Sequence, residues 1–470
     1  MPAIITNKFR IHNAAQFVEG FGEAANTIMY LGIGRPQPWA NEKSPDAPID
    51  TLQQEYQYWD DMLALKRIQA SDVTQAVIRR NWANGKYYDA YRHDYDGSAG
   101  QGVDIDTGSP VPRANLFEAN FYVITDEYNV YKCIDNRDST NAVVPSIVQP
   151  TGRSTSIITT GDGYQWKYMY TISPADVIKF ASTDFMPVKQ LASNPGASDA
   201  YIDQWLVQDA AVAGTIDRIL VTNAGGSYTS APVVSILGDG TGASANAVID
   251  LGSGEITAIE IVNPGSGYTH ATIQLSAGGG GAGGTAIAII SPQDGHGANP
   301  VEELGGYYAM MNCRLEYADG AGDFTVWNDY RRIMVVKEPT NYGSSVIATN
   351  STLSAVHSIT VSAVLGTFLE DEQITGGTSG AVGDILDMTD NGDSTITIRY
   401  TQLRGDNPSG EVFAIGEEIT GNDSGASATV DSKTNPEVEH YSGDIIYVEN
   451  RRAINRADDQ IEDIKIIVEM

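Results

Sequence analysis

The stretch IDRILVTNAGGSYTSAPVVSI (216–236) returns 40 residues later as ITAIEIVNPGSGYTHATIQLS (256–276), and this repetition decides the fold. A constant spacing without a gap indicates a duplicated supersecondary unit. Short apolar runs between Gly and Asn turns predict that each copy forms β-strands. The matching positions that keep the 40-residue spacing are Ile216/Ile256, Ile219/Ile259, Asn223/Asn263, Tyr228/Tyr268 and Thr229/Thr269.

A second duplication lies further along the chain. FLEDEQITGGTSGAVGDI (368–385) returns 45 residues later as FAIGEEITGNDSGASATV (413–430). This pair also predicts short strands joined by Gly-rich turns. Its matching positions are Phe368/Phe413, Ile374/Ile419, Gly376/Gly421, Ser379/Ser424 and Gly380/Gly425.

Changes in composition near residues 210, 300 and 345 set the expected domain plan. The fold class is predicted as mainly β with few short helices. One host domain, made of residues 1–209, 293–345 and 434–470, is interrupted by two small β-repeat modules at 210–292 and 346–433. Insertions are tolerated best at exposed loop tips, so each module is expected to project from the host.

Composition excludes several classes of protein. The 470 residues carry 60 acidic and 29 basic side chains, a formal net charge of −31. Nucleic-acid binding needs clustered Lys and Arg, and the chain has no such cluster. The two cysteines, Cys133 and Cys313, cannot form a disulfide scaffold. No run approaches the roughly 20 apolar residues of a membrane span, and the start of the chain does not resemble a signal peptide.

Local patterns predict three further features. The apolar spacing after an Asp or Thr cap predicts a helix over residues 50–68. Two alternating runs flank Asp126–Asn129, which indicates a hairpin over residues 121–134. Alternation in GDGYQWKYMYTI (161–172) places the aromatic side chains on one face of a strand, as a core or an interface: Tyr164, Trp166, Tyr168 and Tyr170.

Motifs for chemistry are absent from the local sequence. The spacing of His and Cys fits no zinc site, and no Gly-rich loop ends in the lysine of a phosphate cradle. Asp387–Asp393 is the string most like a calcium loop, but its alternation is imperfect and a closing Glu is missing, which favours an acidic hairpin turn. The Asn-Gly turns before Tyr228 and Tyr268 could offer sugar-stacking platforms; Tyr packed under each turn is favoured. No catalytic residue, cofactor or metal is expected.

Arginine pairs and aromatic residues mark candidate interface positions. Arg pairs in an acidic protein suit bidentate contacts to carboxylates of a partner, and Trp, Tyr and Arg dominate binding hot spots. For most of the Trp residues, packing in the core is the favoured role. The candidate interface residues are Trp39, Arg79, Arg80, Trp82, Tyr164, Trp166, Tyr447, Arg451 and Arg452.

The ending SGDIIYVENRRAINRADDQIEDIKIIV (442–468) resembles the gene product eight family, the baseplate wedge subunits of T-even-type contractile-tailed phages. Other similar stretches lie in the family's order, and together they cover about 60% of the chain: ITNKFR (5–10), the Gly32–Trp39 loop, IRRNW (78–82), VYKCID (130–135) and GDGYQWKYMYTI (161–172). The two repeat modules depart from the family pattern.

This resemblance implies a two-layer β-sandwich host that forms a homodimer, is held by neighbouring wedge subunits in the virion's tail baseplate, and has no enzyme activity. The predicted function is therefore a structural wedge subunit, assembled in the host cytoplasm. Two alternatives remain open. One is a virion adhesin or carbohydrate-binding protein that reaches tail fibres or the host surface through its modules. The other is a virion glycanase, because carboxylate pairs are plentiful.

Overall fold

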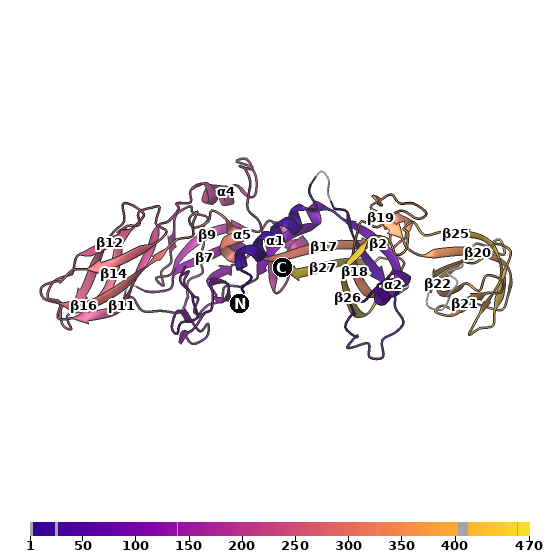
Figure 1. Cartoon of the computed structure of the whole chain (residues 1–470), viewed down its shortest axis with the longest axis horizontal. Helices are drawn as coiled ribbons and strands as arrows, with labels where there is room; N and C mark the ends of the chain where they lie inside the picture. Colours follow the sequence, from indigo (N-terminus) through magenta and orange to yellow (C-terminus); the bar gives the residue numbers. More distant parts are fainter. Residues whose placement is uncertain (1–2, 24–26, 139, 327, 403–411, 458) are drawn as a thin grey trace. The chain divides into compact units, whose positions relative to one another are not determined.

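The computed structural model describes residues 3–23, 27–138, 140–326, 328–402, 412–457 and 459–470. Over these residues the chain is mainly β, as predicted, and forms two compact units. The first unit contains Met1–Gln16, Thr74–Met310 and Ile467–Met470, and the second contains Phe17–Val73 and Met311–Ile466. The helices are α1 (Asn7–Glu19), α2 (Leu52–Asp60), α3 (Pro174–Phe180), α4 (Ile202–Asp209) and α5 (Pro300–Leu304) (Figure 1). The predicted division into host and modules follows other boundaries and stays a prediction.

The first unit holds a four-stranded sheet in the order β6-β7-β9-β8 and a pair β4-β5. It also holds the ends of two long strands that line up with β10 and β3 in the order β10-β3-β17-β27. The strands are β3 (Val73–Ile78), β4 (Gly102–Val103), β5 (Pro110–Val111), β6 (Tyr122–Ile124), β7 (Asn129–Asp135), β8 (Ile158–Thr159), β9 (Gln165–Thr171), β10 (Phe185–Val188), β17 (Tyr308–Glu316) and β27 (Ile461–Glu469).

The hairpin expected near Asp126–Asn129 joins β6 to β7, with Ile124 opposite Val130. The aromatic residues that follow do not all share one face. Tyr164, Trp166 and Tyr168 lie in one core cluster, whereas Tyr170 lies in another. The pairing of β7 with β9 shifts by one residue between Val130 and Tyr131, and such a bulge turns the next side chain to the opposite face.

The first pair of repeats folds into a six-stranded antiparallel sheet, here called the first module (216–290). Each copy supplies three strands: β11 (Ile216–Gly226), β12 (Val234–Gly238) and β13 (Ser244–Asp250) from the first copy, and β14 (Glu255–Asn263), β15 (Ala271–Leu275) and β16 (Ala282–Ile290) from the second. The order β12-β15-β16-β11-β14-β13 interleaves them. The equivalent residues Ile219 and Ile259 face each other across β11 and β14. Neither copy therefore completes its own sheet.

The turn residues that the two copies of the repeat share have a structural role. The amides of Gly225 and Gly265 donate hydrogen bonds to the side-chain oxygens of Asn223 and Asn263, at 2.9 and 3.0 Å. The tyrosines that follow, Tyr228 and Tyr268, are buried at 3% and 5% exposure. The favoured prediction, a Tyr packed under each turn, is therefore confirmed, and buried rings leave no platform on which a sugar could stack.

Each of these tyrosine rings packs on a glycine of the other copy. A Cβ built on Gly281 would overlap the ring of Tyr228, and one built on Gly240 would overlap the ring of Tyr268. Gly281→Ala and Gly240→Ala are each expected to lower the free energy of unfolding by about 1–3 kcal/mol, because the ring must leave its site. Urea unfolding measures this. Gly226→Ala is the control, since a Cβ there meets open space, and an equal loss in the control would contradict the packing argument.

The second unit contains a five-stranded sheet in the order β19-β2-β1-β18-β26. Its core includes Tyr30, Trp59, Leu65, Met334 and Val336. The strands are β1 (Met29–Gly34), β2 (Met62–Ile68), β18 (Asp329–Lys337), β19 (Thr352–Ser354) and β26 (Asp444–Asn455). β26 is the end strand, so one side of its main chain faces away from the sheet.

The helix predicted over residues 50–68 is wrong beyond Asp60. Thr51 caps α2 as expected, because its hydroxyl oxygen accepts a hydrogen bond from the Gln54 amide at 3.3 Å. The helix ends at Asp60, and Met62–Ile68 forms β2 between β1 and β19. A strand buried on both faces carries a continuous apolar run, which sequence periodicity cannot distinguish from a buried helix.

The second pair of repeats closes into a six-stranded barrel, here called the second module (357–434). The first copy supplies β20 (His357–Leu365), β21 (Gln373–Gly376) and β22 (Val382–Asp390), and the second supplies β23 (Ile396–Gln402), β24 (Glu418–Gly421) and β25 (Ser427–Thr434). The order β20-β23-β22-β21-β24-β25 again interleaves the copies. Asp387–Asp393 forms the end of β22 and its turn into β23, the acidic hairpin that the sequence favoured.

Two glutamates 45 residues apart exchange contacts between the copies of the barrel. Glu372 accepts hydrogen bonds from the amide and hydroxyl of Ser424, both at 2.9 Å. Its equivalent, Glu417, accepts from the amide and hydroxyl of Ser379, at 2.9 and 2.8 Å. Each copy therefore caps a turn of the other. Burial raises the pKa of both carboxyls, but these hydrogen bonds outweigh it and leave each pKa below its ordinary value.

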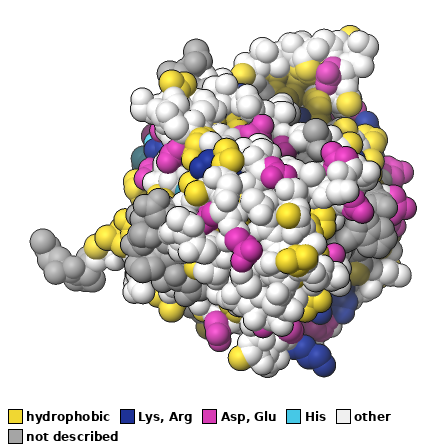
Figure 2. All heavy atoms as spheres, turned by 90° about the vertical axis from the view of Figure 1, so that its right-hand side faces the viewer, with side chains coloured by type: hydrophobic (Ala, Val, Ile, Leu, Met, Phe, Trp, Pro, Cys, Tyr) yellow, Lys and Arg dark blue, Asp and Glu magenta, His cyan; other side chains and the backbone are white. Residues whose placement is uncertain are grey.

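The surface at the barrel's side of Figure 1 is acidic in character. Figure 2 looks onto that side and shows Asp and Glu side chains spread over it, with few Lys and Arg. The sequence gives the same balance, a formal charge of −31. An acidic surface favours solubility and steers basic partners towards it.

Candidate assembly surface

The residues singled out for an interface fall in both units, and each group is described by itself. In the second unit they lie on β26 and on the Pro-rich loop that precedes α2. The loop is attached to the sheet by contacts with Arg331 and Asp329 of β18. The main-chain oxygen of Pro36 accepts a hydrogen bond from Arg331 at 3.2 Å, and Arg35 pairs with Asp329 at 2.7 Å.

Trp39 binds the edge of β26. Its ring nitrogen donates a hydrogen bond to the main-chain oxygen of Arg451 at 2.7 Å. Its own amide donates to one carboxylate oxygen of Glu42 at 2.9 Å, and the other oxygen accepts from the amide of Ala453 at 3.4 Å. The loop thus covers the outward main-chain groups of Arg451 and Ala453, and Trp39 is partly buried in this contact.

Trp39→Phe is expected to lower the stability of this loop by about 1 kcal/mol, because the ring keeps its packing but loses its hydrogen bond to β26. Limited proteolysis within residues 40–47 measures the loss as faster cleavage, by about fivefold. Trp82→Phe, in the other unit, removes a comparable hydrogen bond, from the ring nitrogen to Ser146 at 3.1 Å. Equal acceleration of loop cleavage by both variants would contradict a local role.

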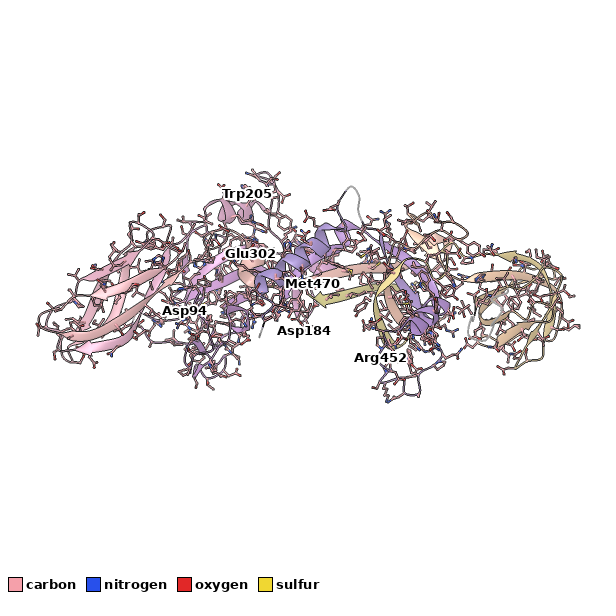
Figure 3. The ribbon with its side chains drawn as sticks, in the orientation of Figure 1. Asp94, Asp184, Trp205, Glu302, Arg452 and Met470 are labelled. Atoms are coloured by element: carbon pink, nitrogen blue, oxygen red, sulfur yellow. The ribbon has the colours of Figure 1, made fainter. Side chains whose placement is uncertain are left out.

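Tyr447, Glu449 and Arg451 form a chain of polar contacts on β26. The Tyr447 hydroxyl donates to Glu449 at 2.9 Å, and the other oxygen of Glu449 lies 3.3 Å from Arg451. Burial and the neighbouring Glu449 raise the pKa of Tyr447 to about 12. Arg451 is 40% exposed and Arg452 is exposed. Figure 3 labels Arg452 in the second unit. Both arginines thus keep surface that a partner can reach.

Arg79, Arg80 and Trp82 lie in the first unit and are partly buried. Arg79 donates to the main-chain oxygen of Ser182 at 2.9 Å. Arg80 donates to the Asn120 side chain and lies over the ring of Tyr122, 5.3 Å from its centroid. These side chains already contact neighbouring residues within the first unit. Their role at an interface stays a prediction.

Tyr164 and Trp166 are placed in the core, although the sequence also allowed an interface role for them. Both are 0% exposed, and their rings stack at a centroid distance of 5.3 Å. The Tyr164 hydroxyl donates to the main-chain oxygen of Val144 at 2.8 Å. The alternation of residues along the strand correctly predicted that these two rings share a face. Because that face is buried, neither ring has exposed surface that a partner could contact.

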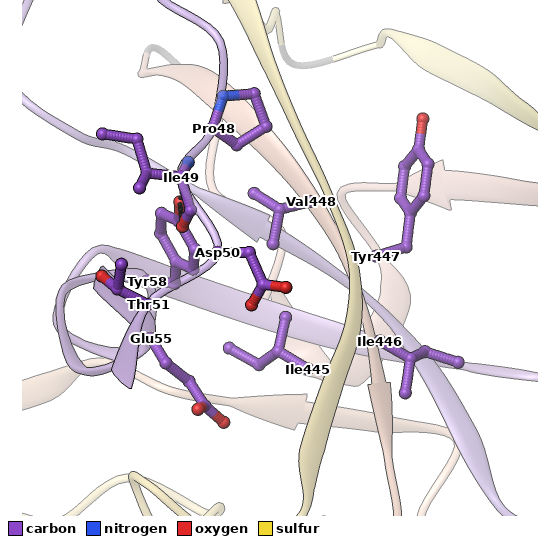
Figure 4. Close-up of a pocket in the computed structure, with 10 residues that line it drawn as sticks. All are labelled: Pro48, Ile49, Asp50, Thr51, Glu55, Tyr58, Ile445, Ile446, Tyr447 and Val448. Carbon is purple, nitrogen blue, oxygen red and sulfur yellow. Dashed lines mark hydrogen bonds between the residues drawn. The ribbon is translucent and has the colours of Figure 1, made fainter. Parts of the chain in front are cut away.

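A pocket of about 330 Å³ lies beside β26 in the second unit. Figure 4 shows its two walls, the segment from Pro48 to Thr51 on one side and Ile445–Val448 of β26 on the other. Glu55 and Tyr58 of α2 complete it. The sequence survey missed these residues. The one sequence signal that could have indicated this pocket was Ile49, an apolar residue inside a loop otherwise rich in Pro and polar residues.

A buried network of charges lies in the first unit. Lys132, fully buried on β7, contacts Glu303 of α5 at 2.5 Å, and its ammonium lies 4.3 Å from the ring centroid of Tyr91. His296 contacts Asp217 of β11 at 2.7 Å. Burial lowers the pKa of both Lys132 and His296, although the neighbouring carboxylates act in the opposite direction.

Metal-binding clusters, disulfides and membrane-spanning helices are absent from the part of the chain that the structure describes. Within those ranges, no three His, Cys, Asp or Glu side chains form a group that could hold a metal ion. Cys133 and Cys313 are both buried, and neither forms a disulfide. No helix there is long and apolar enough to cross a membrane. The buried network is best read as structural.

Comparisons with known proteins confirm a resemblance to the gene product eight family over part of the chain, whereas the stretches 161–172 and 442–468 lie outside the matched family model. The family model described as bacteriophage T4 Gp8 matches residues 3–147, a range that contains Trp39, Arg79, Arg80 and Trp82. The baseplate wedge protein gp8 of Enterobacteria phage T4 is 25% identical over 215 residues, which cover 40% of this chain and 60% of the phage protein. The chain therefore spans less than two thirds of this relative's length.

Proposed function

We propose that this chain is a structural subunit of the baseplate wedge of a contractile-tailed phage, located in the tail baseplate of the virion. The observation that carries the proposal is the match to the Gp8 family over residues 3–147, together with the similarity to a protein named as a baseplate wedge protein. The strand-rich fold of two compact units suits a part that transmits load through rigid surfaces.

Its partners are proposed to be other wedge subunits and a second copy of itself, bound without covalent bonds. Arg451 and Arg452, which remain accessible on β26, are suited to bidentate contacts with carboxylates of a neighbour. Acidic surfaces would steer docking onto basic patches. Contraction would then proceed by rigid-body movements across these interfaces. The proposal includes no catalysis, no binding of nucleic acid and no insertion into a membrane. Contacts of the two modules with tail fibres or the host surface are an additional part of the proposal.

Location in the particle tests this function. Phage particles that carry a tagged copy of the chain are labelled with antibody and imaged, and label at the distal end of the tail is expected. Label elsewhere, or intact contractile particles made without the chain, would remove the proposal. Size-exclusion chromatography with light scattering tests the second copy, and a monomer at micromolar concentration would exclude the homodimer alone.

Deletion of residues 210–292, which contain the first module, separates the alternatives. Loss of adsorption by otherwise intact particles would favour the adhesin, whereas loss of assembly would favour the wedge subunit. Incubation of the purified protein with envelope polysaccharide tests the glycanase, which requires the release of reducing ends.

A further inference from the structure

The pocket beside β26 follows the main chain of the strand. Ile445, Ile446, Tyr447 and Val448 all line it, and Figure 4 shows Ile445 and Val448 on one side of the strand and Ile446 and Tyr447 on the other. The pairing of β26 with β18 shifts between Ile445 and Tyr447, and this bulge interrupts the regular alternation of side chains. A cavity lined from both sides of the strand lies along its edge. β26 is the end strand of its sheet, so this edge presents main-chain donors and acceptors.

The Pro-rich loop covers one part of the edge of β26 and leaves another part uncovered. The pocket lies along this uncovered part and is here called the slot. Near the end of β26, Trp39 and Glu42 bind the main chain of Arg451 and Ala453. At Ile445–Val448 the loop stands off, and the pocket of about 330 Å³ separates it from the strand. A natural edge is commonly covered, so an open stretch next to a covered one marks a place for an added strand.

The outer wall of the slot is held in place by Tyr58. Its hydroxyl accepts a hydrogen bond from the Ile49 amide at 2.9 Å and donates one to the Ile49 main-chain oxygen at 2.8 Å. Pro48 adds a fixed backbone angle next to it. A wall that is already ordered loses little entropy when a segment binds, which favours affinity.

The chemistry of the slot identifies the occupant. Ile49 and Ile446 line it with apolar side chains that are 57% and 45% exposed. Asp50 and Glu55 add two carboxylates, neither of which has an ion-pair partner among the described residues. An apolar floor beside two carboxylates matches an extended segment in which an apolar side chain alternates with Lys or Arg.

We propose that the slot binds an extended basic segment of a partner protein, which adds as a strand beside Ile445–Val448. Its apolar side chain fills the pocket and its Lys or Arg side chains face Asp50 and Glu55. A second copy of this chain is the weaker candidate, because two chains of formal charge −31 repel each other. This proposal rests on the proposed assembly role and adds the chemistry of one partner.

Peptide binding to the full chain tests the proposal. The probe is a fluorescein-labelled hexapeptide that alternates Lys with Val or Ile, and fluorescence anisotropy reports its binding at low salt. A peptide with Glu in place of Lys is the comparison, and is expected to bind at least tenfold more weakly. A basic peptide N-methylated on its edge-facing amides is also expected to lose binding, because it cannot pair with the strand.

Matched variants locate the site. Ile49→Arg places a cation in the slot and is expected to abolish binding, whereas Leu52→Arg, at a 78% exposed position outside the lining, leaves it unchanged. Asp50→Asn and Glu55→Gln are each expected to weaken binding by about threefold. Equal binding of basic and acidic peptides, or unchanged binding by Ile49→Arg, would overturn the proposal.

The remaining possible outcome is that a second copy of the chain occupies the slot, which sedimentation tests. If sedimentation shows a dimer that Ile49→Arg dissociates and Leu52→Arg does not, the slot is filled by a second copy and the heterologous strand is refuted. Location of the chain in particles is a separate measurement. Absence from the baseplate with intact peptide binding would remove the proposed function and keep the slot.

Discussion

Replacing Lys132 by Met is expected to lower the free energy of unfolding by about 3–5 kcal/mol, because it leaves the carboxylate of Glu303 buried without its cation. Lys132 is 0% exposed and Glu303 is 4% exposed in side-chain terms, so water cannot replace the lost partner. Glu303 also accepts hydrogen bonds from the amides of Gly297 and Asn299, at 2.8 and 3.2 Å. The loss therefore reaches the loop that carries His296.

Urea unfolding of the variants measures this effect, with Glu302 as the matched control. Glu302 precedes Glu303 on the same short helix but is exposed (labelled in Figure 3). Glu302→Gln should change stability by less than about 0.5 kcal/mol. The double variant Lys132→Met/Glu303→Gln should lose less than the sum of the two single variants, by about 1–3 kcal/mol. Additive losses would show that the two side chains do not act as a pair.

Acidification is expected to weaken the second module through Glu372 and Glu417. The pKa of each carboxyl is lower in the folded chain than its ordinary value. Their stabilisation is therefore fully present above the ordinary Glu pKa of about 4.3 and is lost as pH falls through the lower folded-state pKa. At neutral pH, each charge-assisted set of hydrogen bonds contributes about 2 kcal/mol.

The double variant Glu372→Gln/Glu417→Gln isolates this contribution. Hydrogen exchange of peptides 368–385 and 413–430 is compared between the variant and the parent chain at each pH. We expect roughly 4 kcal/mol less protection in the variant at pH 7 and a smaller difference at pH 3, which lies below the ordinary Glu pKa, so that part of the stabilisation is already lost. A difference that is the same at both pH values would rule out ionised carboxylates as the cause. Glu418→Gln, at an exposed position next to Glu417, is the control.

Sequence alone predicted what depends on local repetition. The 40- and 45-residue spacings predicted strand-forming duplications, because turn residues and apolar alternation act over a few neighbours. The same local signals could not say that Met62–Ile68 is a strand. That segment pairs with β1 and β19, which come from other parts of the sequence. Partners that the chain brings in from afar decide such elements.

The candidate surface shows the same limit. Trp39 and Arg451 were selected one by one for their residue types, and the fold brings them together although 412 positions separate them. Trp166 was selected for the same reasons and is fully buried. Lys132 and Glu303, 171 positions apart, left no signal at all. Residue type suggests what a side chain can bind, but only the fold decides whether it faces a partner.

The interleaved strand order of the two modules has a consequence for synthesis. A ribosome releases the first copy of the first module 40 residues before the second, which takes about 2–8 seconds at ordinary elongation rates. Hairpins form within microseconds, so the first copy waits, incomplete, for nearly all of that time. Chains emerging from neighbouring ribosomes carry the same unfinished half. Exchange of copies between nascent chains, a domain swap, is therefore the misassembly that we expect of this fold.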